Sequence, residues 1–256
     1  MTDAFYATDG DRIVASDLTR GPWDPGSQHA GPPSALLARA LERCEPREGA
    51  RIARVTVEIL APVPIAPIGV SARVVRPGRS VELLEASLEG ADGELMHARG
   101  WRLAESDITA DWERQEPPPG YEDAEALEFF PTGESVGWHT AMEIVFARGR
   151  FLEPGPGVAW MRPSVALVEG EEISPLQRVL LAADAGNGIS APLDWQSHIF
   201  INTDLTVHLL RPPEGEWIGL DSVTHVDGIG LTDTALWDER GRIGRAAQTL
   251  LVRKRA

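Results

Sequence analysis

The sequence INTDLTVHLLRP at residues 201–212 decides the fold prediction. Its alternate side chains from Thr203 to Leu209 share one face of a predicted strand, and that face is apolar except at Thr203. The sequence VTVEILAP at residues 55–62 resembles LTVHLLRP at residues 205–212, with the same Thr, Val, Leu and Pro at corresponding positions. The chain is therefore predicted to contain one fold twice, with copies 150 residues apart.

Length and composition are those of an ordinary globular protein. The chain has 256 residues, of which 43% are hydrophobic and 25% charged, enough for one large domain or two of ordinary size. No apolar run approaches the roughly 20 residues of a membrane span, and the N-terminus has no basic start followed by an apolar core. Cys44 is the single cysteine, which excludes an intrachain disulfide and a cysteine-based metal cluster. We expect a cytoplasmic protein without a membrane span.

The charge argues against nucleic acid as a partner. The formal net charge is -15 at pH 7, whereas phosphate recognition draws on clustered positive charge. An anionic ligand would need a local patch of arginines, such as Arg76, Arg79 and Arg253 near predicted strand ends. The six histidines show no zinc or mononuclear iron spacing, so we expect neither a metal nor a cofactor.

The first half, residues 1–105, is predicted to hold one helix followed by strands. The sequence GPPS at residues 31–34 can begin a helix, because proline is tolerated in the first turn, and Pro46 ends it. Turn residues separate four predicted strands, at residues 52–60, 69–75, 80–88 and 94–103. Since no helix lies between these strands, we expect an antiparallel sheet with the helix across it, and an α+β fold class.

The second half, residues 137–256, repeats this order. A linker is predicted at residues 106–136, because QEPPPG at residues 115–120 cannot pair as a central strand. After it come a predicted strand over residues 138–150 and a helix that begins at Ser174-Pro175 and ends before GNG at residues 186–188. Four strands follow, at residues 203–210, 216–225, 231–238 and 243–253.

Polar residues on predicted apolar faces distinguish the second half. Asp184 lies four residues after Leu180 on the buried stripe of the helix, in its last turn. Gln248 is the polar side chain on the small and apolar face of the last strand, so it needs a polar partner inside. Thr203 adds a third polar group on the helix-facing side. We expect Asp184 to act as a general base, with Gln248 and Thr203 beside it.

Each of these residues alone also allows a structural role. Asp184 could cap a loop, Gln248 could bond a neighbouring strand, and Thr203 could be a strand-edge hydroxyl. The corresponding positions of the first half are Ala53 for Thr203 and Gly100 for Gln248, while Glu42 lies off the apolar stripe of its helix. The second half is therefore predicted to carry the active site, and the first half to support it.

Three short motifs resemble those of the acyl-CoA thioesterase II (TesB-like) double-hotdog family. They are AAD at residues 182–184, NTDLT at residues 202–206 and AAQT at residues 246–249, and the resemblance covers most of the chain. In the first half, HAGPP at residues 29–33 resembles the glycine-containing start of the first hotdog helix. The resemblance implies two fused hotdog repeats that hydrolyse acyl-CoA without a covalent intermediate.

The resemblance also implies roles for particular residues. Asp184, Thr203 and Gln248 would hold and activate the attacking water, while backbone N–H groups at a helix start would stabilise the oxyanion. Four further positions would contact the substrate: His29, Gly31, Gly186 and Asn187. The AGNG sequence after Asp184 is less bulky than the continuation in better-studied members, which leaves the acyl-chain length open.

Two other functions stay open. A hotdog protein can bind an acyl or polyketide chain without catalysis. The sequence DPGSQH at residues 24–29 places Asp24 and His29 at the spacing of hotdog enoyl-CoA hydratases, but it lacks the Asn-Pro found between them. Since a hotdog module exposes sheet edges, we also expect a homo-oligomer, most simply a dimer.

Overall fold

The computed structural model describes residues 4–110 and 116–255. Its first half matches the predicted helix and strands to within about three residues at each end. The elements in chain order are β1 (Ala4–Asp9), β2 (Arg12–Ala15), a short 3-10 helix η1 (Asp17–Thr19), α1 (Gly31–Arg43), β3 (Ala50–Ile59), β4 (Pro67–Arg76), β5 (Val81–Gly90) and β6 (Gly93–Ala104).

The second half repeats the helix and the four strands that follow it, with additions. Its elements are α2 (Trp138–Ala141), β7 (Met142–Arg150), β8 (Glu153–Pro163), β9 (Ala166–Val168), α3 (Pro175–Ala183), α4 (Gly186–Ile189), β10 (His198–Asn202), β11 (Asp204–Leu209), β12 (Ile218–Asp227), β13 (Ile229–Asp238) and β14 (Gly241–Lys254). The predicted strand over residues 138–150 is wrong at its start, where one helical turn precedes β7. Strand β8 was not predicted, because its sequence is rich in turn residues. It forms because it pairs with β7 and β12.

The two halves join through the repeated sequence itself. β3 and β11 pair antiparallel, with Val57 opposite Leu205 and Val55 opposite Val207. Between these pairs Thr206 Oγ1 donates to Thr56 Oγ1 at 3.2 Å. This joint makes one 14-stranded sheet in the described part of the chain, in the order β7-β8-β12-β13-β14-β11-β3-β6-β5-β4-β2-β1-β9, with β10 beside β14. The predicted edge-to-edge union of the two halves is confirmed.

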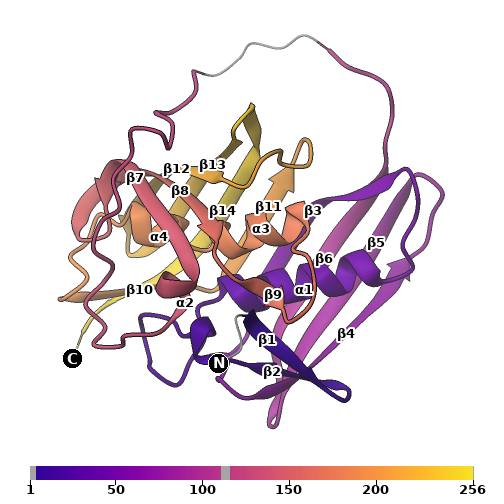
Figure 1. The fold of residues 1–256 in the computed structure, drawn as a ribbon, viewed down its shortest axis with the longest axis horizontal. Helices are drawn as coiled ribbons and strands as arrows, with labels where there is room; N and C mark the ends of the chain where they lie inside the picture. The colour runs from indigo at the N-terminus through magenta and orange to yellow at the C-terminus, as the bar shows by residue number, and fades with distance from the viewer. Residues whose placement is uncertain (1–3, 111–115, 256) are drawn as a thin grey trace.

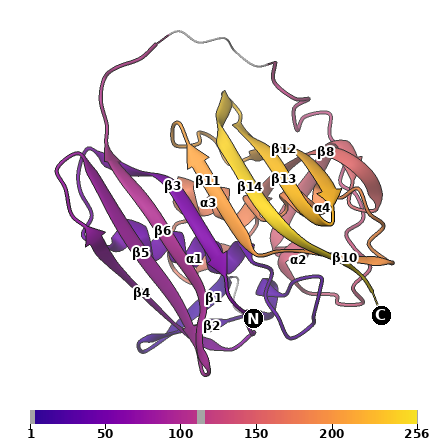
Figure 2. The same cartoon turned by 180° about the vertical axis from the view of Figure 1, so that it is seen from behind.

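Helices α1 and α3 lie side by side against one face of the sheet (Figure 1). The view from behind shows the opposite face of the sheet (Figure 2). The two helices run antiparallel, because the start of α1 meets the end of α3. A Cβ on Gly31 would lie 2.7 Å from the carbonyl oxygen of Leu181, so only glycine allows this approach. Apolar side chains such as Leu36, Leu41 and Leu180 fill the space between helices and sheet and are fully buried. The helix pair is therefore the common core of both halves.

The segment after the linker's proline run packs against the second half. The amide of Glu125 donates to Phe146 O at 3.0 Å, and the amide of Phe146 donates back to Glu125 O at 2.7 Å. Five residues later, Phe130 is 5% exposed. Residues 111–115 of the predicted linker lie outside the described residues. The described end of the linker thus contributes to the interior.

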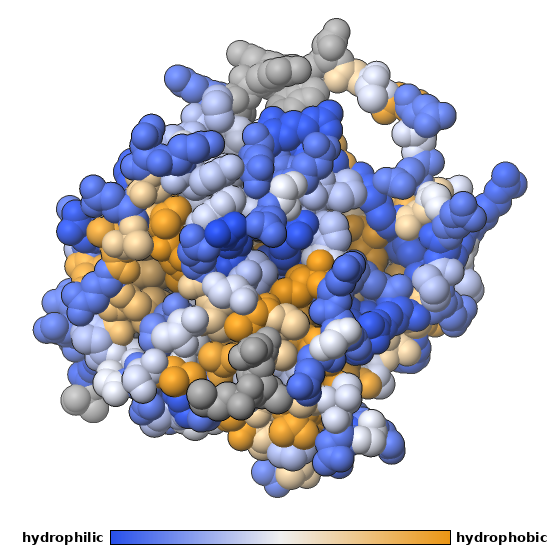
Figure 3. Space-filling model, in the orientation of Figure 1, coloured by the Kyte–Doolittle hydropathy of each residue, from blue (hydrophilic) through white to orange (hydrophobic). Residues whose placement is uncertain are grey.

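On the helix side of the molecule, polar side chains cover most of the surface and apolar residues gather in separate patches (Figure 3). No helix in residues 4–110 or 116–255 is long and apolar enough to cross a membrane.

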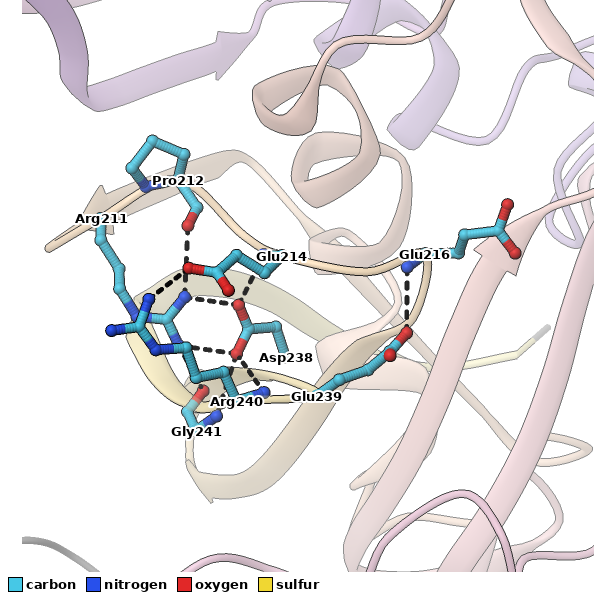
Figure 4. A network of polar contacts seen from close by, with 8 residues as sticks. All are labelled: Arg211, Pro212, Glu214, Glu216, Asp238, Glu239, Arg240 and Gly241. Atoms are coloured by element: carbon cyan, nitrogen blue, oxygen red, sulfur yellow. Dashed lines mark hydrogen bonds and ion pairs between the residues drawn. The ribbon is translucent and has the colours of Figure 1, made fainter.

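The corner between β13 and β14 is held by a buried carboxylate (Figure 4). The side chain of Asp238 has no exposed surface and accepts from Arg211 Nη1 and Nη2 at 2.5 and 2.6 Å. It also accepts from the backbone amides of Glu214, Arg240 and Gly241 at 2.7, 2.9 and 3.0 Å. Burial acts to raise the pKa of Asp238, but Arg211 and the amides outweigh it and hold that pKa below its ordinary value.

Candidate active site

A cavity of about 400 Å³ lies where the start of α1 meets the end of α3. Asp184 follows the last residue of α3 and is 4% exposed. Its Oδ1 accepts from Asn202 Nδ2 at 2.8 Å, and its Oδ2 lies 3.1 Å from Nδ1 of His29. A carboxylate held by two side chains at the wall of a cavity is placed to exchange a proton with a molecule bound there.

Gln248 reaches the same point from β14 and is 1% exposed. Its Nε2 donates to the backbone oxygen of Asp184 at 3.1 Å and lies 3.5 Å from Oδ1 of that residue. Its Oε1 accepts from the amide of Asn187 at 3.1 Å. The structure thus brings Asp184 and Gln248 together, as predicted.

Gly186 and Asn187 both lie against the side chain of Gln248. A Cβ on Gly186 would lie 2.6 Å from Thr234 Oγ1 and 3.1 Å from Gln248 Oε1, so a larger residue would displace the amide. The side chain of Asn187 donates to Phe200 O at 3.2 Å. Asn187 also lines the cavity, so its predicted contact with substrate stays a prediction.

The predicted position of Thr203 is wrong. Its side chain is exposed, and its Oγ1 lies 3.5 Å from both Asp204 Oδ1 and Thr249 O rather than near Asp184. The cause is a bend at residue 203, between β10 and β11, which shifts the alternation of faces by one residue. Asn202 therefore occupies the inward position and donates to the carboxylate. The sequence signal that could have found it is the polar pair Asn202-Thr203, either of which can face inward.

His29 lies deeper than a loop residue at the cavity rim would. Its side chain is 10% exposed and stacks on Trp138, with ring centroids 4.1 Å apart and planes 4° apart. Burial lowers the pKa of the His29 imidazole below its ordinary value, the charge of Asp184 opposes this, and His139 lowers the pKa further. His29 is therefore a neutral imidazole near pH 7, with its one proton on either Nδ1 or Nε2.

The single Nδ1 of His29 has two neighbours. It lies 3.1 Å from Asp184 Oδ2, and the amide of Gly31 donates to it at 3.1 Å. A ring nitrogen either donates or accepts, so the two contacts belong to different proton positions. With its proton on Nδ1, His29 donates to the Asp184 carboxylate; with the proton elsewhere, a protonated Asp184 donates to His29. This contact can follow a proton as it enters and leaves Asp184.

Both halves of the chain build the site. His29 and Gly31 come from the first half, whereas Asp184, Asn202 and Gln248 come from the second. The first half, predicted to support the site, thus provides a direct partner of the Asp184 carboxylate. The reason is the antiparallel pairing of the helices, which brings the start of α1 to the end of α3.

Two of the arginines predicted to bind an anion, Arg76 and Arg79, lie away from the cavity, and Asp24 at its rim is engaged within its own turn. Arg47 Nη2 donates to the carbonyl of Arg79 at 2.7 Å near the end of α1. A 13-residue helix spans about 20 Å, so Arg79, and Arg76 beside it, lie at the far end of α1 from the cavity. Asp24 Oδ1 accepts from Gly26 N and Ser27 Oγ at 2.9 and 3.1 Å in its own turn. Within the described residues, His, Cys, Asp and Glu form no group of three or more that could hold a metal ion.

The architecture is shared with solved structures over nearly the whole chain. A hotdog-fold protein of unknown function from Alicyclobacillus acidocaldarius has a TM-score of 0.76 at 16% identity, covering 100% of this chain and 97% of that chain. A putative thioesterase II from Thermobifida fusca has a TM-score of 0.72 at 20% identity, covering 98% and 94%. An acyl-CoA thioesterase II from Mycobacterium marinum has a TM-score of 0.68 at 10% identity, covering 97% and 95%. The predicted class, an α+β double hotdog, is confirmed.

The sequence itself identifies the family. The acyl-CoA thioesterase N-terminal domain matches residues 19–103, and the acyl-CoA thioesterase C-terminal domain matches residues 117–252. No curated protein matches the chain at a significant level. The chain belongs to the acyl-CoA thioesterase family, as the sequence motifs predicted. Membership supports thioester hydrolysis as its general chemistry and implies an acyl-CoA substrate.

Proposed function

We propose that this protein hydrolyses acyl-CoA thioesters in the cavity beside Asp184. The observation that carries the proposal is the Asp184 carboxylate, 4% exposed at the cavity wall and contacted by Asn202, Gln248 and His29. Burying a carboxylate lowers stability unless polar partners offset the cost, and here such partners hold the carboxylate at the cavity wall.

In the proposed reaction, Asp184 takes a proton from a water whose oxygen attacks the thioester carbon. Gln248 and Asn202 hold the carboxylate in position. The tetrahedral intermediate collapses with breakage of the C–S bond, and the proton passes from Asp184 to the departing thiolate. The products are the free acid and coenzyme A. While Asp184 holds the proton, His29 Nδ1 can accept a hydrogen bond from it, which stabilises the intermediate state.

The oxyanion would be stabilised at the start of α1. Pro32 and Pro33 have no N–H, so Gly31 provides the one amide donor among the first three residues of this helix. That amide now donates to His29 Nδ1 at 3.1 Å. When His29 Nδ1 is engaged by Asp184, either donating to the carboxylate or accepting from the protonated acid, the Gly31 amide becomes available to the carbonyl oxygen at the positive end of the helix dipole.

A cation near the cavity supports an anionic carrier. The Arg255 guanidinium lies 5.6 Å from the ring centroid of Trp23, which lines the cavity, and 4.5 Å from that of Trp195. Arg253, two residues earlier, lies opposite Ile199 of β10 and is exposed. Arg255 is therefore better placed for the phosphates of coenzyme A than Arg253, Arg76 or Arg79. Binding of free coenzyme A should therefore weaken as salt rises.

The test is release of free thiol from a panel of acyl-CoA esters. We expect the wild-type protein to release thiol and Asp184→Asn to lower kcat by roughly 10²–10⁴, the usual contribution of general base catalysis. Asparagine keeps the shape of the side chain, so binding of acyl-CoA should survive. A wild-type protein that binds acyl-CoA without releasing thiol would instead be a non-catalytic acyl-binding hotdog.

A further inference from the structure

Aromatic side chains gather around the cavity. Aromatic residues make up 6% of the chain. Five of them line this one cavity: Trp23, Phe129, Phe130, Trp138 and Phe151. Four of them lie within residues 129–151, and Trp23 comes from the N-terminal turn, so two separate segments of the chain meet at this cavity. Five of the 20 residues that line the cavity are thus aromatic.

These rings hold one another in position. Phe129 and Phe151 meet edge to face, with centroids 4.9 Å apart and planes at 81°. Phe130 lies 5.1 Å from Phe151 and stacks on Trp195 at 5.3 Å. Because each ring is packed by its neighbours, the cavity has a preformed shape that requires little ordering when a ligand enters.

Three of the five rings lie in the inner part of the cavity. Phe130 and Phe151 are each 5% exposed, and Trp138 is 1% exposed. By contrast, Asp24 and Pro62, which also line the cavity, are exposed. An acyl group whose carbonyl lies at Asp184 would therefore direct its tail away from the solvent-exposed rim and against these rings.

The inner end is also compact. The whole cavity has about 400 Å³, towards the lower end of the range for small-molecule sites. Gly188 completes this end: a Cβ there would lie 3.5 Å from the Phe130 ring and 3.7 Å from the Phe151 ring, at ordinary contact distance. The absence of a side chain at Gly188 leaves a gap beside two ring edges.

We propose that the preferred acyl group is a compact aromatic one, such as an arylacetyl or aroyl group, rather than a linear aliphatic chain. This rests on the proposed thioesterase function of the same cavity. A ring in the substrate gains edge-to-face or offset contacts with Phe130 and Phe151, and each such pair favours binding by roughly twofold to tenfold beyond area burial. A linear aliphatic chain gains only the binding free energy of buried apolar area, and it also loses rotational freedom when it binds.

The test compares three thioesters with the same number of acyl carbons: phenylacetyl-CoA, cyclohexylacetyl-CoA and octanoyl-CoA. We expect kcat/KM for phenylacetyl-CoA to exceed that for octanoyl-CoA by about tenfold, and that for cyclohexylacetyl-CoA by about fivefold. The cyclohexyl ester separates aromaticity from compact shape. Equal or higher kcat/KM for octanoyl-CoA overturns the proposal.

A pair of variants locates the preference. Phe151→Leu keeps an apolar side chain at the inner end but removes a ring, and should lower the phenylacetyl preference to within about twofold of octanoyl. The control is Phe146→Leu, since Phe146 packs 4.9 Å from Phe151 but does not line the cavity. If both variants keep the preference, these rings do not set it. Circular dichroism spectra and melting temperatures verify that both proteins fold.

Binding to Asp184→Asn separates this proposal from the proposed function. Calorimetry measures the Kd of the three thioesters on a protein expected not to consume them. If the wild type hydrolyses no thioester but Asp184→Asn binds phenylacetyl-CoA most tightly, the thioesterase proposal fails and the aromatic preference stands. If thioesters are hydrolysed but octanoyl-CoA binds as tightly, the aromatic preference fails alone.

Discussion

The two ends of the helix pair can be compared directly, because they are built from corresponding residues. Asp184 follows Pro175 by nine residues in the second half, and Glu42 follows Pro33 by nine in the first. At one end the start of α1 meets Asp184; at the other the start of α3 meets Glu42. Both ends have an acid at the end of a helix, yet only the Asp184 end has the cavity described above.

The difference lies in what the partner helix presents to the acid. Ser174, the N-cap of α3, donates its hydroxyl to Glu42 Oε1 and Oε2, each at 2.8 Å, and Gln177 Nε2 donates to Oε2 at 2.8 Å. At the corresponding place before α1, the residue is Ala30, which has no capping hydroxyl, and His29 reaches the acid instead. One end thus became a structural cap, and the other kept space for a ligand.

The residues of the sheet that lie next to each helix end also differ between the two halves. In the first half Gly100 lies beneath Leu41, whose Cδ1 would be 3.1 Å from a Cβ at that position. In the second half the corresponding Gln248 lies beside Asp184. Around it, buried hydroxyl pairs link Ser222 to Thr234 at 2.8 Å and Thr224 to Thr232 at 2.7 Å. The two halves share a similar frame, but the sheet beside Leu41 has a glycine where the sheet beside Asp184 has a polar side chain.

The largest effect should separate the two acids. Asp184→Asn should lower kcat for acyl-CoA hydrolysis by roughly 10²–10⁴, whereas Glu42→Gln, the same change at the other end, should leave kcat within about twofold. The measurement is steady-state thiol release with both purified variants. A comparable loss in both would mean that the acids act on structure, and would remove the distinction between the two ends.

The second effect concerns the hairpin corners of the two halves. Asp238→Ala leaves Arg211 and three backbone amides without their carboxylate, so we expect a loss of about 3–5 kcal/mol in the free energy of unfolding. Asp92, at the corresponding corner of the first half, is exposed, and Asp92→Ala should change that free energy by less than about 0.5 kcal/mol. Urea unfolding monitored by tryptophan fluorescence measures both. Equal losses would contradict the role given to Asp238.

The third effect tests the shift of faces at residue 203. Asn202→Ala removes a hydrogen bond to the Asp184 carboxylate and should lower kcat by about tenfold to a hundredfold, from roughly 1.5–3 kcal/mol for a charged hydrogen bond. Thr203→Ala alters an exposed hydroxyl and should change kcat by less than about twofold. The same thiol assay decides, and the opposite order would restore Thr203 as the orienting residue.

The smallest effect is a pH dependence at the cap end. Burial raises the pKa of Glu42 above its ordinary value, although Gln177, Ser174 and Arg43 oppose this. A raised folded-state pKa means that the folded protein keeps the proton to higher pH than the unfolded chain does. This contribution to stability is present below the unfolded pKa of about 4.3 and is lost as pH rises through the folded pKa.

Glu42→Gln should therefore flatten the fall in stability as pH rises from about 4 through the raised folded-state pKa. Denaturant midpoints at a series of pH values measure this, with the wild-type protein as the reference. An unchanged pH profile in Glu42→Gln would show that Glu42 does not titrate differently in the folded and unfolded states.

Local patterns were sufficient for much of this protein. The alternation in residues 201–212 and its copy at residues 55–62 predicted two halves, because strand faces follow a period of two. The same patterns indicated Asp184 and Gln248, since a polar side chain on an apolar face must find a partner inside. These inferences held because each depends on neighbours along one helix or one strand.

Tertiary structure decided the rest, because it depends on residues distant in the chain. The bend at residue 203 exchanged Asn202 for Thr203, and no propensity of these two residues selects which one faces inward. His29 became a partner of Asp184 only through the antiparallel approach of α1 to α3 at Gly31. The aromatic wall likewise gathers rings from the N-terminal turn, the linker and the β7–β8 turn. Periodicity determines which face of an element is buried, whereas the packing of elements determines what that face meets.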